Sequence, residues 1–187
     1  MTQRAKLALA TAGLALSGGM LAAVPAASAS TTASSLPSPA REAAPTPGKA
    51  VRFSEALALS SKRKGKNLAA GYRLRSLKTG LCLNSNGNGT VYGKTCDSTN
   101  YQRWNGGDFS TLVSQQTDWC LDGNGYGKVY TKGCNATSYQ SWWFEDHGRN
   151  CWEIYSDHTR LRLDGNGNGS VYAKNDNDTT YQRWCIT

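Results

Sequence analysis

The sequence predicts an all-β domain made of three similar units, and three observations support this prediction. Nearly the same run of residues, without internal gaps, occurs at 81–104, 119–142 and 161–184. The region 71–187 lacks the apolar period of an α-helix, and short runs of Val, Leu, Tyr and Trp alternate with Gly/Asn/Asp clusters that favour tight turns. One such unit cannot bury its own apolar face, so the three are expected to share a core. The repeats are placed at about 71–107, 108–146 and 147–187.

The first 29 residues have the organisation of a secretory signal peptide. A short basic start is followed by an Ala/Leu-rich stretch from about Leu7 to Val24 and then by a small-residue cleavage site, Ala27-Ser28-Ala29. A membrane anchor is the alternative, but Ser17, Gly18 and Gly19 interrupt the apolar run. We therefore expect a secreted protein, cleaved near Ala29, with no transmembrane segment in the mature chain.

Residues 30–70 are predicted to form a flexible linker before the domain. Residues 30–50 are rich in Ser, Thr, Ala and Pro, a composition that cannot form a core. Residues 51–59 differ, because apolar side chains fall on alternate positions as in a β-strand, and the basic run 62–66 follows. This segment either packs on its own domain, stays disordered, or docks as a strand into the sheet of a partner protein. The residues that would dock are Val51, Phe53, Leu57 and Leu59.

The positive charge of the chain belongs to this amino-terminal part. The whole chain has a net charge of +8, but residues 71–187 hold 12 Lys/Arg against 11 Asp/Glu, whereas residues 30–70 hold 7 against 2. A nucleic-acid-binding domain needs a basic folded face, so we expect no nucleic-acid partner. Attraction of the basic segment to an anionic cell wall or membrane surface stays open.

The six cysteines form an even set, as expected in an oxidising compartment. Two copies carry a pair of cysteines 14 residues apart at the same two positions, where the third copy has Arg162 and Asp176. The two remaining cysteines are then left for each other. The predicted disulfides are Cys82–Cys96, Cys120–Cys134 and Cys151–Cys185. Arg162 and Asp176 are expected to form an ion pair, which contributes less than about 1 kcal/mol if it is exposed. A zinc site is not expected, because no C-x-x-C pair is present.

Equivalent positions of the three copies predict the core. Four apolar positions recur in every unit, and one of them is a Trp. One such ring from each copy, arranged around a pseudo-threefold axis, can fill the centre of a closed barrel. The equivalent residues are Leu74, Leu112 and Ile154; Leu83, Leu121 and Leu163; Val91, Val129 and Val171; and Trp104, Trp142 and Trp184.

Each unit ends in a Gln-x-Trp triplet, at 102–104, 140–142 and 182–184, and the second copy also carries Cys120-Leu121-Asp122. With these features in phase, the region 71–187 resembles the ricin B-type lectins. The resemblance implies a β-trefoil of twelve strands with pseudo-threefold symmetry. It also implies sugar binding in up to three shallow pockets, and family members often accompany a toxin or a glycoside hydrolase.

The resemblance points to the Asp that follows Cys-Leu as the main sugar acceptor. This position holds Asp122 and Asp164 in copies two and three and Asn84 in copy one. A carboxylate can accept two sugar hydroxyls at once, so copies two and three are the better candidates. Where the family often has Gln and Trp, every copy of this chain has Tyr and Lys. Alternation along the strand turns Val inward and both Tyr and Lys outward, which suits a polyol or an anionic sugar. The predicted carbohydrate-binding residues are Asn84, Asp122, Asn124, Tyr126, Tyr130, Lys132, Asp164, Asn166, Tyr172 and Lys174.

These residues also have other interpretations. Tyr and Lys can be scaffold residues, with Tyr bracing the barrel rim and Lys solvated. Residues 164–169 resemble the start of a calcium loop, but the closing Glu and flanking helices are missing. His147 and His158 have no nucleophile motif around them. We therefore expect no catalytic residues, no metal and no cofactor.

The sequence leaves two functions open. The first is a secreted, non-catalytic lectin that binds a glycan or cell-surface polysaccharide. The second is a protein-docking subunit of a secreted toxin or adhesin complex, which binds another secreted protein through residues 30–66.

Overall fold

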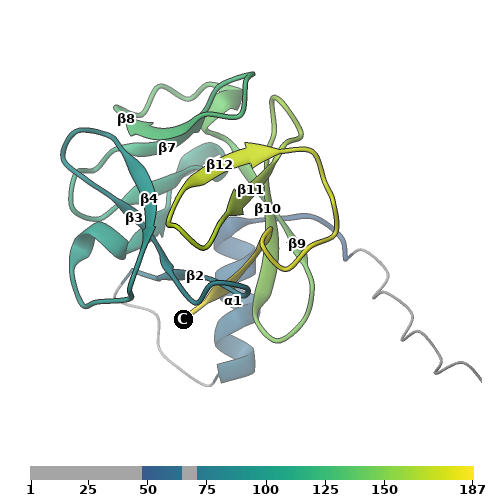
Figure 1. Cartoon of the computed structure of the whole chain (residues 1–187). Helices are drawn as coiled ribbons and strands as arrows, with labels where there is room; N and C mark the ends of the chain where they lie inside the picture. The colour runs from purple at the N-terminus through teal and green to yellow at the C-terminus, as the bar shows by residue number, and fades with distance from the viewer. Residues whose placement is uncertain (1–47, 65–70) are drawn as a thin grey trace, which may run out of the picture. The chain divides into compact units, whose positions relative to one another are not determined.

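The computed structural model describes residues 48–64 and 71–187 of the chain (Figure 1). The predicted signal peptide (1–29) and the first part of the predicted linker (30–47) lie outside the described residues. None of the helices in the described part of the chain is long and apolar enough to cross a membrane.

Residues 71–187 form three units of four short strands. The first unit contains β2 (Leu74–Ser76), β3 (Cys82–Ser85), β4 (Val91–Lys94) and β5 (Trp104–Gly106). The second contains β6 (Leu112–Ser114), β7 (Cys120–Gly123), β8 (Val129–Lys132) and β9 (Trp142–Asp146). The third contains β10 (Cys151–Ser156), β11 (Arg162–Gly165), β12 (Val171–Lys174) and β13 (Arg183–Ile186). Short 3-10 turns occur at η1 (Asn100–Gln102), η2 (Asp108–Ser110) and η3 (Ser138–Gln140).

The outer strands of the three units close into a six-stranded barrel. Antiparallel ladders join β5 to β6, β9 to β10, β10 to β13 and β13 to β2. The two gaps are closed by single bridges between Tyr72 and Trp104 and between Thr111 and Ser141. The inner strands of each unit form a hairpin. This is a β-trefoil, so the predicted all-β fold of three repeats is confirmed.

The three hairpins hold one another in a closed ring. Their tips touch the next hairpin through backbone hydrogen bonds, so that β4, β8 and β12 lie side by side (Figure 1). The three N–H···O contacts, each 2.7–2.8 Å long, are Thr131 to Gly89, Ala173 to Gly127 and Gly93 to Gly169. Each copy therefore depends on its neighbour, as a shared core requires.

The three glycines in this ring are needed for two reasons. Gly89, Gly127 and Gly169 have φ angles of +81°, +81° and +88°, where other residues are strained. A Cβ on any of them would also overlap the backbone oxygen of the neighbouring hairpin. Only glycine allows the hairpins to approach this closely.

Each Gln-x-Trp triplet has a structural role in its own unit. The three Trp rings are buried, and each indole N–H donates a hydrogen bond of 2.9–3.0 Å to a leucine carbonyl oxygen. The three Gln side chains are also buried. Gln102 accepts from the Asp97 amide and donates to the Thr95 carbonyl oxygen, and Gln140 and Gln182 make the same two bonds. The triplet thus fills the core and fixes the loop that follows the hairpin.

The other predicted core positions are buried as expected, except Val171, which is only partly buried. The three predicted disulfides are all present: Cys82–Cys96, Cys120–Cys134 and Cys151–Cys185.

The strand predicted over residues 51–59 is wrong beyond its first two positions. Val51–Arg52 form β1, which pairs with β9, but Phe53–Lys64 form helix α1. Phe53 and Leu57 fit both an alternating and a helical period, so the pattern was ambiguous. The helical stripe is completed by Ala56 and Ser60, which are buried, whereas Leu59 lies off it and is exposed.

This amino-terminal segment packs against its own trefoil. The Phe53 ring stacks on Phe144 with centroids 4.9 Å apart. At the far end of α1, the Arg63 guanidinium makes two hydrogen bonds to the Asp146 carboxylate, of 3.2 and 2.6 Å. Val51, Phe53 and Leu57, predicted to dock into a partner, instead contact the protein's own core.

The close contacts between hairpins at Gly89, Gly127 and Gly169 predict that Gly127→Ala destabilises the protein strongly. The added methyl group meets the Ala173 carbonyl oxygen and strains a positive φ, so we expect a loss of about 2 kcal/mol or more in the free energy of unfolding. Gly125 lies in the same loop with open space around it. Gly125→Ala is the matched control and should change the free energy by less than about 1 kcal/mol. Equal denaturant midpoints for the two variants would contradict this role.

The Arg63–Asp146 pair predicts a pH-dependent contribution of the amino-terminal segment. Burial raises the pKa of Asp146, but the hydrogen bonds from Arg63 and Gly148 outweigh it, so the folded-state pKa is below the ordinary value. Stability from this group is therefore present above about pH 4 and is lost as the pH falls through the folded-state pKa. Asp146→Asn should flatten the fall in unfolding free energy between pH 5 and 2.5, measured by chemical denaturation.

Arg63→Met is the control for this prediction, because it removes the other half of the same pair. It should flatten the profile similarly, and the double variant should add little. Parallel pH profiles for the wild type and Asp146→Asn would show that the pair does not contribute.

Candidate functional site

The hairpins of copies two and three each present an Asp, a Tyr and a Lys on one face. In copy two, Asp122 on β7 is directly opposite Tyr130 on β8, and Lys132 lies two residues further along. Because side chains alternate along a strand, these three share a face. In copy three, Asp164 on β11 is opposite Tyr172 on β12, and Lys174 follows. We call these two groups the Asp–Tyr–Lys clusters.

In both clusters the carboxylate lies beneath the lysine. Asp122 and Asp164 are each only 1% exposed. The Lys132 ammonium is 3.3 Å from Asp122 Oδ2, and the Lys174 ammonium is 3.6 Å from Asp164 Oδ2. Neither Oδ2 atom has a hydrogen-bond partner among the described residues. The sequence predicted an acceptor at the surface, but the structure places a buried acceptor under a half-exposed cation.

The tyrosine hydroxyl in each cluster faces the carboxylate. Burial raises the pKa of Tyr130, and the hydrogen bond and charge of Asp122 raise it further. Burial also raises the pKa of Tyr172, with Asp164 adding to the effect. Both hydroxyl groups therefore stay protonated at neutral pH and remain available as donors.

Two further tyrosines flank these clusters, and they were not among the predicted site residues. Tyr139 lies close enough to Tyr130, and Tyr181 to Tyr172, to affect the pKa of that neighbour. The ring of Tyr139 packs on His158 with centroids 3.8 Å apart. The signal was present in the sequence, since both tyrosines stand immediately before a Gln-x-Trp triplet.

Copy one is built differently. Asn84 is buried and uses its amide to donate to the Ser85 carbonyl oxygen at 2.9 Å. Lys94 forms an ion pair of 3.1 Å with Asp97. Hydrogen bonds from the hydroxyl and amide of Thr99, with help from Lys94, lower the pKa of Asp97 to about 2. Copy one therefore has no carboxylate beneath its lysine.

Two predicted site residues shape their own loops. The Asn124 side-chain oxygen accepts from the amides of Tyr126 and Lys128, at 3.0 and 2.9 Å. The Asn166 oxygen accepts from the Ser170 amide at 3.0 Å. These oxygens are committed to the loops and are not part of the Asp–Tyr–Lys clusters.

The tip of each hairpin borders the next copy rather than its own. Tyr126 was assigned to copy two, but Gly127 bonds to Ala173, and Lys128 forms a bridge with Tyr172. The backbone next to Tyr126 therefore lies against β12 of copy three, while the Tyr126 side chain itself is 97% exposed. The same arrangement brings Asn168 of copy three to a shallow hollow that it shares with Tyr92 of copy one.

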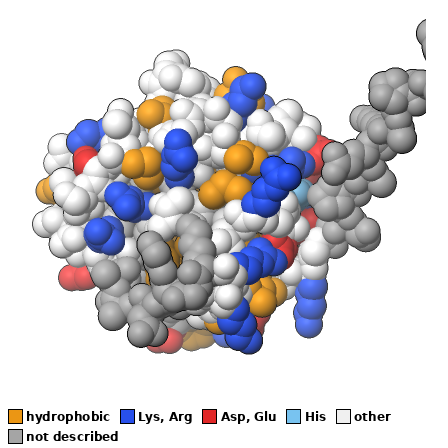
Figure 2. Space-filling view, turned by 90° about the horizontal axis from the view of Figure 1, so that it is seen from below, with side chains coloured by type: hydrophobic (Ala, Val, Ile, Leu, Met, Phe, Trp, Pro, Cys, Tyr) orange, Lys and Arg blue, Asp and Glu red, His pale blue; other side chains and the backbone are white. Residues whose placement is uncertain are grey.

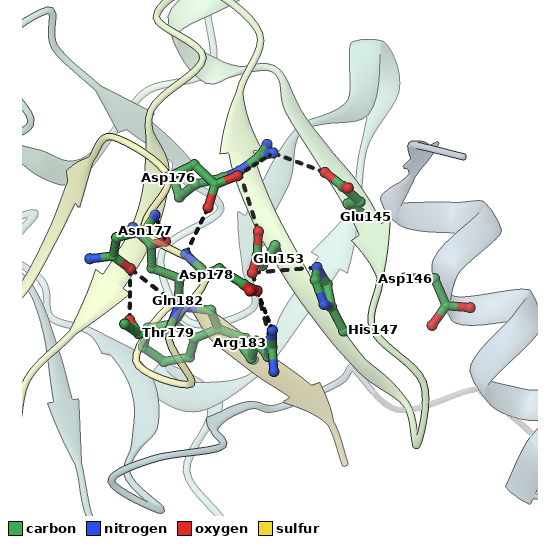
Figure 3. Close-up of polar contacts among 12 residues, drawn as sticks. Glu145, Asp146, His147, Glu153, Asp176, Asn177, Asp178, Thr179, Gln182 and Arg183 are labelled. Carbon is green, nitrogen blue, oxygen red and sulfur yellow. Dashed lines mark hydrogen bonds and ion pairs between the residues drawn. The ribbon is translucent and has the colours of Figure 1, made fainter. Parts of the chain in front are cut away.

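A separate network of charges occupies the third copy (Figure 3). The buried Glu153, 2% exposed, is contacted by Arg162, Arg183 and His147 at 3.4–3.6 Å. Arg162 also binds Glu145 at 2.9 Å. The predicted pair of Arg162 with Asp176 is confirmed at 3.2 Å. Since Arg162 is only 13% exposed and contacts three carboxylates, it is a buried hub and not a weak surface pair.

Part of this network has the spacing of a metal site. Ligand atoms of His147, Glu153 and Asp178 lie within 4.8 Å of one another. However, Arg183 binds Asp178 at 2.5 Å and also contacts Glu153 (Figure 3). A metal ion would have to displace this guanidinium. The arrangement is better explained as charge pairing that takes the place of the disulfide missing from copy three.

A family model of the ricin-type beta-trefoil lectin domain matches residues 70–184, more than half of the chain. This chain belongs to the ricin-type beta-trefoil lectin family. A comparison with curated proteins found no match. The amino-terminal segment 48–64 lies outside the part of this lectin-family chain that the family model matches.

Three solved structures share the fold of this lectin-family protein. A designed threefold-symmetric protein, ThreeFoil, has a TM-score of 0.55 at 19% identity, over 62% of this chain and 96% of its own. SeviL, solved bound to the asialo-GM1 saccharide, has a TM-score of 0.53 at 17% identity, over 64% and 98%. The exo-beta-1,3-galactanase 1,3Gal43A from Clostridium thermocellum has a TM-score of 0.57 at 20% identity, over 64% of this chain but 30% of its own.

The charge network predicts that Arg162→Met destabilises this lectin-family protein by about 3–5 kcal/mol, because Glu153 and Glu145 lose a buried counter-charge. Arg160→Met is the matched control. The guanidinium groups of Arg160 and Arg162 both lie 4.4 Å from the Tyr155 ring, but Arg160 is exposed and should contribute about 1 kcal/mol or less. Urea denaturation compares the two, and equal losses would contradict the hub role of Arg162.

Proposed function

We propose that the protein is a secreted, non-catalytic lectin that binds glycans or cell-surface polysaccharide through the Asp–Tyr–Lys clusters of copies two and three. The observation that carries this proposal is the pair of buried carboxylate oxygens, Asp122 Oδ2 and Asp164 Oδ2, which lack a hydrogen-bond partner among the described residues. Each oxygen has only the ion-pair contact with its lysine, at 3.3 and 3.6 Å, and a buried acceptor that makes no hydrogen bond is unfavourable. A sugar hydroxyl is a neutral donor of the right size to satisfy it.

The half-exposed lysine controls the access of a ligand to the buried carboxylate. When Lys132 or Lys174 swings aside, the carboxylate becomes open to a ligand, and the ammonium stays close enough to donate to a second hydroxyl. The protonated Tyr hydroxyl supplies another donor on the same face. Two neighbouring hydroxyls of a sugar ring match this set of one acceptor and two donors, and a sugar carboxylate would add an ion pair with the lysine.

Relatives of the same fold agree with this proposal. SeviL is described as bound to a saccharide, and the galactanase acts on a polysaccharide. Both are under 25% identical to this chain, so they support the fold and not a particular sugar. Secretion is supported by the signal-peptide pattern of residues 1–29. A surface of the domain on which lysine and arginine outnumber acidic side chains (Figure 2) is compatible with an anionic cell-surface polymer.

The alternative of a protein-docking subunit has lost its main support. That hypothesis depended on an unpartnered apolar strand at 51–59. Val51, Phe53 and Leu57 of this segment pack on the trefoil of the same chain. We therefore do not favour it as the main function.

The proposal is tested with Asp122→Asn, Asp164→Asn and the double variant, on a broad glycan array and by titration with the glycans that bind. Replacing the carboxylate removes a charge-assisted acceptor, so each single change should weaken its own site about 10-fold or more. The double variant should lose binding altogether.

The matched control is Asp118→Asn, which removes an exposed carboxylate outside the two clusters and should bind as the wild type does. Circular dichroism checks that all variants are folded. A double variant that still binds the wild-type set of glycans would rule out these clusters as the site.

A further inference from the structure

A groove outside the Asp–Tyr–Lys clusters lies mainly on copy two, bordered by Gly107 at the end of copy one and by Asp157 of copy three. It consists of two adjoining hollows of about 300 Å³ each, which share Phe109 and Ala136. One hollow is also lined by Trp143 and Asp157, and by Arg52 from β1. We call the whole feature the Phe109–Trp143 groove.

One wall of this groove is an aromatic ring held out into solvent. Phe109 is 67% exposed, which is unusual for a large apolar side chain. Its backbone is left-handed, with φ of 54°, and the next residue, Ser110, has φ of 63°. Such angles are unfavourable for residues other than glycine and persist only when other contacts hold them. The buried Ser110 hydroxyl does so by donating to the Trp142 carbonyl oxygen at 2.5 Å.

The other wall combines a second aromatic ring with fixed polar groups. The indole N–H of Trp143 donates to Asp157 Oδ1 at 3.0 Å, which fixes both side chains. The Arg52 backbone pairs with Trp143 across the β1–β9 ladder. Its guanidinium makes no hydrogen bond or ion pair with any of the described residues. Thr137 and Ser138 add hydroxyl groups to the same hollow.

This set of groups matches the chemistry of a sugar ring. Aromatic rings can cover the C–H face of the sugar, while a carboxylate, a guanidinium and hydroxyls bond to its hydroxyl groups. The whole groove is lined by one guanidinium, that of Arg52, and by two carboxylates, those of Asp157 and Asp108, so an anionic sugar would be repelled and a neutral sugar fits better.

A series of side chains leads from the groove toward the Asp–Tyr–Lys cluster of copy two. The Ser138 hydroxyl, in the groove, is 2.9 Å from His158 Nδ1. The His158 ring packs on Tyr139. Tyr139 in turn is close enough to Tyr130 of the cluster to affect its pKa, so the groove and the cluster lie on neighbouring parts of copy two.

We propose that the Phe109–Trp143 groove binds a second part of the same glycan, so that copy two recognises a neutral oligosaccharide chain and not a single terminal sugar. This inference rests on the proposed function of the copy-two cluster. It also gives the amino-terminal segment a role, because Arg52 comes from β1, outside the residues matched by the family model.

The test is a length series of neutral oligosaccharides, using β-1,3-linked galactose and β-1,4-linked glucose oligomers of one to four residues. Affinity is measured by titration calorimetry and by NMR of the Trp143 indole N–H. In the wild type, the affinity for at least one series should rise 10-fold or more between one and three residues. The longer oligomers, but not the single sugar, should shift the Trp143 signal.

Two variants should remove this gain with chain length. Phe109→Asn deletes the ring but keeps a residue that tolerates the left-handed backbone. Asp157→Asn keeps an acceptor for Trp143 and removes the charge. Leu77→Ala, which removes an exposed apolar side chain that does not line the groove, is the matched control and should keep the gain in full.

The outcomes separate this inference from the proposed function. If the double variant of Asp122→Asn and Asp164→Asn abolishes binding while Phe109→Asn and Asp157→Asn keep the full gain with length, the groove proposal is wrong and the lectin proposal stands. If the wild type binds short and long oligomers equally, the groove proposal is also wrong. If the wild type binds no oligomer and no glycan on the array, both proposals fail.

Discussion

The fold depends on one hydrogen bond that occurs three times, from a buried Trp indole to a leucine carbonyl oxygen of the hairpin in the same unit. Because of this bond, the large Trp side chain can fill the barrel centre without leaving its indole N–H unpaired. The neighbouring Gln adds two bonds to the loop after the hairpin. Every unit repeats these hydrogen bonds, so the three hairpins are held in equivalent positions. In these positions each hairpin tip can bond to the next hairpin at Gly89, Gly127 or Gly169.

This rigid frame explains how the candidate sites differ although their backbones are alike. The same face carries Asp122 in copy two, Asp164 in copy three and Asn84 in copy one. Copy one also has Asp97 where the other copies have Asn135 and Asn177. Lys94 therefore pairs with Asp97 in the following loop, whereas Lys132 and Lys174 lie over a buried carboxylate. The frame also sets the neighbours of each site, since every hairpin tip lies against the following copy. The backbone of Gly127 and Lys128 in copy two therefore contacts copy three.

Two parts of the molecule depart from the threefold pattern. One is a network of charged side chains in copy three, and the other is the amino-terminal segment 48–64. In copy three, Arg162 and its carboxylates stand where the other copies have their hairpin disulfide, and the one disulfide of this unit, Cys151–Cys185, lies elsewhere, between β10 and β13. The segment 48–64 covers Phe144 with Phe53 and brings Arg52 to the Phe109–Trp143 groove. The asymmetric additions thus lie around copies two and three, next to the clusters with carboxylates.

The sequence by itself determined the features that follow from repetition and from local alternation. Equivalent positions identified the Leu, Val and Trp core and the disulfide pairs, and strand alternation placed Asp, Tyr and Lys on one face. Tertiary packing decided the rest. The pattern at 51–59 fitted a strand and a helix alike, and contact of Ala56 and Ser60 with the trefoil favours the helix. The contact of the copy-two hairpin tip with copy three and the groove at Phe109 depend on segments that are distant in the sequence. A local pattern cannot predict such contacts. It indicates to which face of a strand a side chain points, but not which residues of other segments lie next to that side chain.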